Sequence, residues 1–189
     1  MFALRAVGKY RDTLRYRGNT GEEKVEYRPW RCNQIQDSAL HLLVANTINA
    51  SGNSSNIFVG YGAITYLAVG SGLVGWDADP NNVTKPVTQT ALTTEMTRFS
   101  LTPDEFVFLD SSGVVLAPQV LSNRFKVSYT LGVNDANGDL REFGLFGGLA
   151  TGVADSGTMF NWITHPLINK DNTLVIEREI DIEFSINRS

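Results

Sequence analysis

The chain has 189 residues, of which 42% are apolar and 19% are charged, so it can bury a core and is not expected to be disordered outside its loops. Its formal net charge of −4 argues against nucleic acid as a partner. It contains no run of about 18 apolar residues, so no membrane-spanning helix is expected. Cys32 is the single cysteine, which excludes an internal disulfide.

Residues 1–31 are predicted to form a basic β-hairpin arm. They hold eight basic and four acidic residues, a net charge of +4. The side chains alternate in the way typical of a strand, and one face carries Lys9, Arg11, Thr13, Arg15 and Arg17. The stretch "GNTG" at 18–21 supplies a turn, and the return strand ends at Pro29.

A helix is predicted near residues 34–49. Within "NQIQDSALHLLVANTIN" the apolar positions Ile35, Ala39, Leu42 and Leu43 lie on one helical face. Asn33 is the predicted cap of this helix. No other stretch of the chain has a convincing helical period.

Everything after the helix is predicted to be strand and turn. The clearest strand is the last one, where apolar residues alternate with Glu177, Glu179, Asp181 and Glu183. We therefore predict a mainly β protein, an antiparallel β-sandwich with a single short α-helix and an N-terminal β-hairpin arm. Its predicted domains are the basic hairpin arm at 1–31 and a β-sandwich domain at 32–189.

Gly70, Gly72 and Gly75 form a G-x-G-x-x-G pattern after an apolar run. In a dinucleotide-binding turn a helix follows these glycines and holds the pyrophosphate at its N-terminus. Here the next residues are "WDADPNNVTKP", and the prolines predict that no helix runs there. We expect the glycines to be structural, allowing a sharp turn or the approach of another backbone, and we expect no cofactor.

The sequence predicts no enzyme and no metal centre. His41 and His165 lie in no metal-binding pattern, and no G-x-S-x-G motif occurs. The loops "DADPNN" and "NDANGD" place oxygen ligands at alternate positions, yet both are better explained as turns, the second as a hairpin turn. Acidic residues on the last strand stand about 6.6–7 Å apart, the spacing of an inverting glycosidase pair, but a solvated or partner-facing sheet explains them better.

Four stretches carry a resemblance to a family. They are "NQIQDSALHLL", "ITYLAVGSG", "TALTTEMTR" and "LREFGLFGG", the last followed by "GTMFNWITHPLINKDNTLVIEREIDIEFSI". In order and spacing they resemble small virion proteins of tailed bacteriophages, often labelled tail, baseplate or fibre proteins. The resemblance implies a structural protein of the virion, whose partners are its own copies and other virion proteins, and it supplies no catalytic residues.

Two alternatives stay open beside the tail, baseplate or fibre-attachment subunit. One is a capsid decoration (cement) protein. The other is a β-sandwich module that binds host glycans, with Trp76 and Trp162 stacking on sugars. A hydrolase built on the acidic strand is a third and weaker hypothesis.

The charge pattern predicts an interface. A row of like charges on one strand destabilises a sheet unless opposite charges lie nearby, and the arm is the richest source of cations. We predict that the arm packs beside the acidic strand, in the same copy or an adjacent one. The candidate interface residues are Arg11, Arg15, Arg17, Glu177, Glu179, Asp181 and Glu183.

Overall fold

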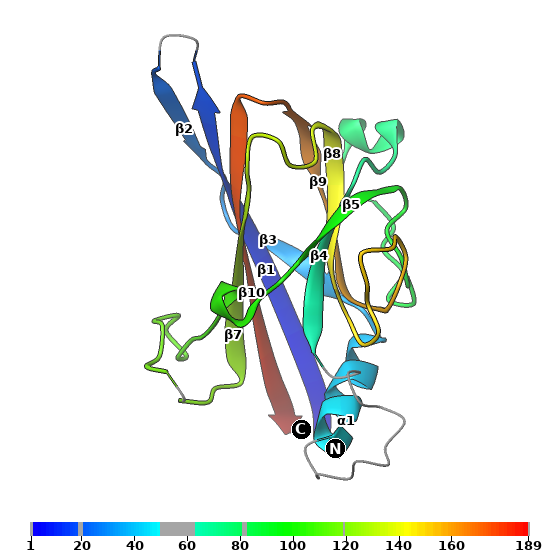
Figure 1. Cartoon of the computed structure of the whole chain (residues 1–189). Coiled ribbons are helices and arrows are strands. Elements are labelled where there is room, and N and C mark those ends of the chain that lie inside the picture. Colours follow the sequence, from blue (N-terminus) through cyan, green and yellow to red (C-terminus); the bar gives the residue numbers. More distant parts are fainter. Residues whose placement is uncertain (1, 19–20, 50–62, 81–82, 119, 189) are drawn as a thin grey trace. The chain divides into compact units, whose positions relative to one another are not determined.

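The computed structural model describes residues 2–18, 21–49, 63–80, 83–118 and 120–188. These residues form antiparallel strands, the helix α1 (Ala39–Asn49) and two short 3-10 helices, η1 (Val74–Ala78) and η2 (Pro103–Glu105) (Figure 1). The prediction of a mainly β, antiparallel chain is confirmed. The chain divides into two compact units, the first made of residues 1–33, 102–137 and 171–189 and the second of residues 34–101 and 138–170.

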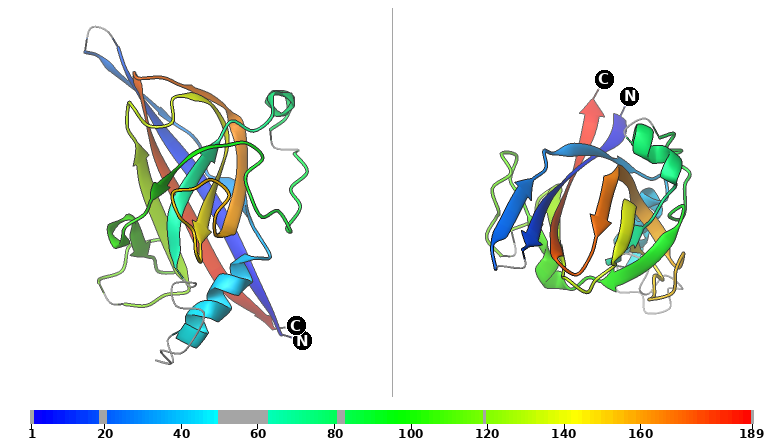
Figure 2. Two further views of the ribbon diagram at one scale, coloured as in Figure 1. Left: turned by 45° about the vertical axis from the view of Figure 1, so that its right-hand side comes forward. Right: turned by 90° about the horizontal axis from the view of Figure 1, so that it is seen from above.

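The sheet of the first unit is organised around the last strand, β10 (Leu174–Arg188). It pairs with β1 (Phe2–Arg17) from Phe2 opposite Arg188 to Tyr16 opposite Leu174, so the two strands run side by side (Figure 2). On its other side β10 pairs with β7 (Arg124–Leu131), which pairs in turn with β6 (Phe106–Phe108). One face is buried and is lined by Tyr10, Leu14, Val127, Leu131, Ile176, Ile180 and Ile182.

The N-terminal segment forms the predicted hairpin but differs from the predicted arm. β1 pairs with β2 (Glu23–Tyr27) at its end and with the start of β3 (Arg31–Ile35) near Lys9. Because β10 pairs with β1 along almost its full length, β1 is an inner strand of the sheet. The sequence predicts a division between residues 31 and 32. The first compact unit instead joins residues 1–33 with residues 102–137 and 171–189.

The helix begins later than predicted. Gln34 and Ile35 pair with Trp162 and Asn161 of β9 (Thr158–Lys170), which keeps this stretch extended as the end of β3. The amide of Ala39 then bonds to the carbonyl oxygen of Gln36 and opens α1. Asn33 lies within β3, so its predicted role as the helix cap is wrong.

The second unit is a sheet in the order β5 (Glu95–Ser100), β4 (Ile64–Gly70), β8 (Gly138–Gly147), β9 and the end of β3. Every residue of β8 from Leu140 onward is buried. On one side of the sheet a core cluster forms from Ala68, Leu92, Phe146, Met159 and Trp162. The loop before β8 is a turn, but β7 and β8 pair with other strands, so the hairpin predicted at "NDANGD" is wrong.

Candidate functional site

The predicted charges lie on the side of the first unit's sheet that faces away from its buried side. We call the side chains of β1, β10 and β7 on this side the charged face. Arg11 Nε donates a hydrogen bond to Glu179, and Arg15 Nε donates to Glu177 Oε1 over 2.7 Å. Lys9 Nζ lies 3.4 Å from Asp181 Oδ2. The structure thus brings Arg11 and Arg15 to Glu179 and Glu177 within one copy of the chain. It also brings Lys9, which is not one of the candidate residues, to Asp181.

Two of the candidate interface residues stand apart from these pairs. Arg17 lies exposed at the end of β1, opposite Glu23 of β2, and makes no ion pair with any described residue. Glu183 is also exposed, and Arg124 of β7 stands opposite it in the register. Their proposed role in contacts with another copy stays a prediction.

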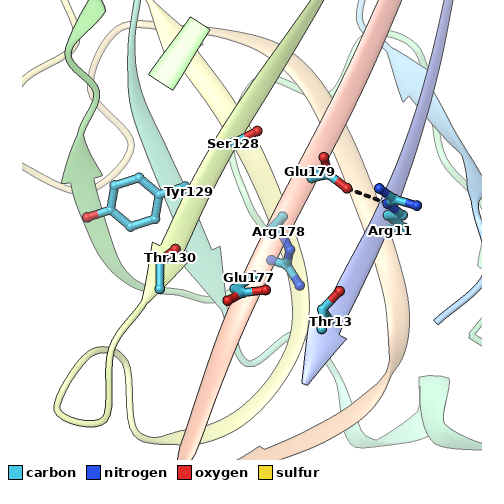
Figure 3. A pocket seen from close by; sticks show the side chains of 8 residues that line it. All are labelled: Arg11, Thr13, Ser128, Tyr129, Thr130, Glu177, Arg178 and Glu179. Atoms are coloured by element: carbon cyan, nitrogen blue, oxygen red, sulfur yellow. Dashed lines mark hydrogen bonds and ion pairs between the residues drawn. The ribbon is translucent and has the colours of Figure 1, made fainter. Parts of the chain in front are cut away.

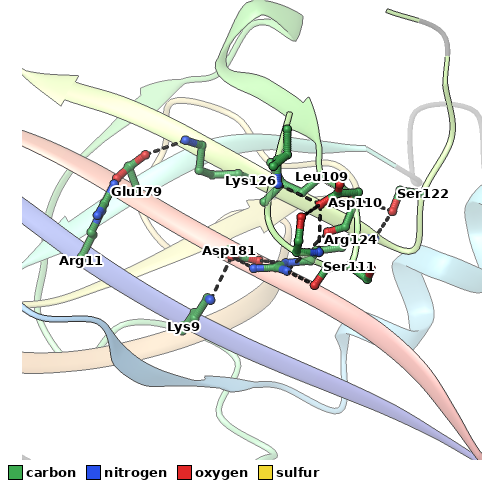
Figure 4. Close-up of polar contacts among 12 residues, drawn as sticks. Lys9, Arg11, Leu109, Asp110, Ser111, Ser122, Arg124, Lys126, Glu179 and Asp181 are labelled. Atoms are coloured by element: carbon green, nitrogen blue, oxygen red, sulfur yellow. Dashed lines mark hydrogen bonds and ion pairs between the residues drawn. The ribbon is translucent and has the colours of Figure 1, made fainter. Parts of the chain in front are cut away.

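Sequence reasoning missed the cations on the other side of β10. Lys126 Nζ lies 2.6 Å from Glu179 Oε1, and Arg124 donates to both carboxylate oxygens of Asp181 at 2.9 and 2.6 Å (Figure 4). The acidic strand is therefore flanked by cations on both neighbours. The alternation in "RFKVSYTL" would have placed Arg124 and Lys126 on one face, but nothing in the sequence tells which strand β7 joins.

These contacts fix the charge state of two carboxyl groups. Burial raises the pKa of Glu179, but hydrogen bonds and charges from Arg11 and Lys126 together outweigh it and hold the pKa below its ordinary value. Burial likewise raises the pKa of Asp181, while Arg124 and Lys9 lower it by more, so its pKa is also below the ordinary value. Both groups are therefore ionised at neutral pH.

The lowered pKa values predict a loss of stability in acid. A carboxyl group whose pKa falls on folding stabilises the protein above its unfolded pKa and loses this effect as the pH drops through its folded pKa. We expect the free energy of unfolding, measured by urea denaturation, to decrease below about pH 5. The decrease is expected to be shallower in Lys126→Met, which removes one cause of the low pKa of Glu179.

Lys24→Met is the matched control, because Lys24 makes no ion pair with any described residue. Its acid profile is expected to follow that of the unmodified protein. Identical acid profiles for Lys126→Met and the unmodified protein would contradict the conclusion that Lys126 lowers the pKa of Glu179.

Arg124 also contacts segment 108–121, of which residues 108–118, 120 and 121 are described. Its Nη1 donates to the carbonyl oxygen of Ser111 over 3.1 Å (Figure 4). Asp110 Oδ1 accepts bonds from the amides of Ser112 and Val114, each over 2.9 Å. Residues 109–115, whose two ends pair as an isolated β-bridge, are thus folded into a small turn and tied to the charged face. The exposed apolar side chains of segment 108–121 are Phe108, Val114, Val115, Val120 and Leu121.

A pocket of about 340 Å³ opens on the charged face. It is lined by Arg11 and Thr13 of β1, by Ser128, Tyr129 and Thr130 of β7, and by Glu177, Arg178 and Glu179 of β10 (Figure 3). Alternation along the strands directs Tyr129 and Arg178 to the opposite side of the sheet. Its outward lining therefore combines the short hydroxyl side chains of Thr13, Ser128 and Thr130 with longer charged side chains.

In the second unit, Gly70 and Gly72 have the structural roles that the sequence predicts. A Cβ on Gly70 would lie 2.5 Å from the backbone oxygen of Thr94, and Gly72 has a φ of +55°. The prediction that no helix follows is wrong, because the short 3-10 helix η1 forms. Arg141 Nε holds it through a 2.7 Å bond to Asp77 Oδ1.

Buried charged residues of the stretches "LREFGLFGG" and "TALTTEMTR" form hydrogen bonds within the second unit. Glu142 is fully buried and accepts hydrogen bonds from the amides of Thr93 and Thr94 and from Trp162 Nε1, at 3.0, 2.7 and 2.8 Å. Arg98 pairs with Glu95 over 2.6 Å, with both side chains buried. Trp162 is therefore a core residue that packs edge-on against Trp76, and its predicted role in stacking on sugars is wrong.

Comparison with protein-family models, with curated proteins and with solved structures found no match. The resemblance to virion proteins therefore rests on the sequence stretches quoted above.

The remaining candidates for chemistry are the two histidines, and they lie on different elements. His41 is exposed on α1, and His165 is buried on β9 with its ring against Phe143. Within the described ranges, no group of three or more His, Cys, Asp or Glu residues could hold a metal ion, and no helix is long and apolar enough to cross a membrane. Asn81 of "DADPNN" lies outside the described residues.

Proposed function

We propose that the protein is a structural subunit of a tailed-phage virion, in the tail, baseplate or fibre-attachment region. It acts through protein–protein contacts with other copies of itself and with other virion proteins. The resemblance of the quoted stretches supports the phage part of the proposal. The exposed apolar segment 108–121, held on the charged face by Arg124, supports the part that concerns assembly.

The segment has the features of a contact surface. Leu121 is 82% exposed, and Val114 and Val115 of the same segment are 62% and 53% exposed. Clusters of exposed apolar side chains mark interaction sites, because burying them against a partner removes them from water. The bonds of Asp110 and Arg124 fix the backbone of residues 110–114 beforehand, so less conformational entropy is lost there on binding.

We assign the segment to contact with a second copy of the chain. A closed contact between identical copies is the most common oligomer, and it needs only one self-complementary patch. The charged face satisfies most of its own charges within one copy, which leaves the apolar segment as the better contact.

The proposal also concerns the fold. We propose that the chain is the β-sandwich that the sequence predicts, in which sheets pack their apolar faces together.

The test replaces exposed apolar residues by lysine. Val114→Lys and Leu121→Lys are expected to abolish self-association, measured by light scattering over a range of concentrations, because a charge would be buried in the contact. Their unfolding temperatures should stay unchanged, since both side chains are exposed. Leu149→Lys, at an exposed apolar residue of the second unit, is the matched control and should associate normally.

Particle fractionation tests the location. Co-sedimentation with tails supports the proposal, whereas co-sedimentation with heads would identify the decoration protein instead. A chain that stays monomeric at all concentrations and enters no particle would overturn the proposal.

A further inference from the structure

One row of side chains crosses four strands of the first unit on the charged face. Tyr27 of β2 stands opposite Thr13 of β1, Thr13 stands opposite Glu177 of β10, and Glu177 stands opposite Thr130 of β7. Residues opposite one another on antiparallel strands point to the same face, with Cβ atoms about 4.5–5.5 Å apart. Three strand spacings make the row about 14 Å long, comparable to a short oligosaccharide.

The middle of this row is the pocket described above. Within the described part of the chain, the hydroxyl groups of Thr13, Ser128 and Thr130 make no hydrogen bond. Glu177 uses Oε1 for Arg15, and its Oε2 has no partner among the described residues. The pocket therefore presents hydroxyl groups that can donate and accept, together with a carboxylate oxygen that can accept.

An exposed aromatic ring stands next to Thr13 on this face. Tyr27 is 75% exposed, and it lies opposite Thr13 in the pairing of β1 with β2, so both side chains point to the face that carries the pocket. Nearby, Trp30 stacks on Arg11, with the guanidinium carbon 4.8 Å from the ring centre. Trp30 thus helps to hold Arg11, a donor, at the edge of the pocket.

The charges of the pocket select among ligand classes. An anion would have to displace Glu177 and Glu179 from Arg11, Arg15 and Lys126, and a cation would have to displace these three cations from the two acids. An apolar ligand would strip water from the hydroxyl groups without replacing their hydrogen bonds. A neutral ligand rich in hydroxyl groups can donate to Glu177 and accept from Arg11, and one apolar face of a sugar ring can stack on Tyr27.

We infer that the pocket on the charged face binds a neutral saccharide, with Tyr27 as the stacking surface and Glu177 as the acceptor for sugar hydroxyl groups. This site is separate from segment 108–121, so it goes beyond the proposed assembly role. It also replaces the sequence-based assignment of sugar stacking to Trp76 and Trp162.

The test screens the full chain against immobilised glycans and then titrates the best neutral ligand by ligand-observed NMR. Neutral hexose and N-acetylhexosamine oligosaccharides are expected to bind, and sialylated forms of the same chains are expected to bind at least tenfold more weakly. Tyr27→Ala and Glu177→Gln should each reduce affinity at least tenfold. Tyr27→Phe keeps the ring and should bind within about twofold of the unmodified protein.

Leu149→Ala, at an exposed residue of the second unit, is the control outside the pocket and should leave affinity unchanged. Circular dichroism spectra should be the same for all variants, which shows that they fold. No binding to any neutral glycan, equal binding to sialylated chains, or undiminished affinity in Tyr27→Ala would each overturn the inference. Because the lysine variants of segment 108–121 leave the pocket intact, they should still bind the glycan, which separates this test from that of the assembly role.

Discussion

Replacing Asp12 with alanine is expected to lower the free energy of unfolding by about 3–5 kcal/mol. Asp12 on β1 stands opposite Arg178 on β10, and their side chains are 1% and 0% exposed. Arg178 Nε and Nη2 donate to the two carboxylate oxygens over 2.7 and 2.9 Å. Without Asp12 the guanidinium charge stays buried with its counter-ion removed, which is why the loss is large.

Urea denaturation followed by circular dichroism measures this loss. Arg11→Ala, which breaks the partly exposed pair with Glu179, is the control and should cost only about 0.2–1 kcal/mol. The double variant Asp12→Leu, Arg178→Met removes both charges and should be more stable than Asp12→Ala. A cost for Asp12→Ala no larger than that of Arg11→Ala would show that the buried pair contributes little.

Glu142→Ala is expected to destabilise the protein by about 2–4 kcal/mol, because hydrogen bonds to a charged group contribute about 1.5–3 kcal/mol each. The carboxylate of Glu142 receives three N–H groups, and one of these donors, Trp162 Nε1, lies in the core. Its loss leaves that donor buried without an acceptor. Trp162 should then move or take up water, so its fluorescence should shift in the folded state as well.

Glu142→Gln is the informative companion variant. One amide oxygen can keep the bonds from Thr93 and Trp162, but the amide nitrogen would face the N–H of Thr94. We expect an intermediate loss of stability with little change in tryptophan fluorescence. If both variants unfold at the same urea concentration as the unmodified protein, Glu142 does not organise this part of the second unit.

The strands of the first unit could be predicted from the sequence because one face of each is buried and the other is solvated. In β10 this gives strict alternation, and the same holds in β1, so the facing charges of Arg11 and Glu179 could be anticipated. The alternation of side chains does not show which strand pairs with which. Arg124 and Lys126 alternate just as clearly, yet their pairing with Asp181 and Glu179 depends on β7 lying beside β10, a long-range choice that no local signal encodes.

The errors have a common origin in long-range pairing. Residues 34 and 35 have a helical apolar pattern, but backbone hydrogen bonds to β9 keep them extended. One alternative predicts that Trp162 stacks on sugars, whereas the buried Glu142 supplies the acceptor that its indole N–H needs in the core. The row at the proposed saccharide site, Tyr27, Thr13, Glu177 and Thr130, comes from four strands, so it can be recognised only from the register of the sheet.

The pairing of β1 with β10 also governs how the chain reaches its native state. The ion pair between Arg11 and Glu179 closes a sequence separation of 168 residues, and the whole ladder between these strands is of this kind. Loop closure must precede such contacts, so β-rich chains of this topology fold slowly. During synthesis β1 leaves the ribosome first and its apolar side stays without its partner strand until β10 emerges. By then the described strands of the second unit, which precede β10 in the sequence, have all emerged. The first unit is therefore completed last, and until then β1 is a surface on which chaperones or other chains can act.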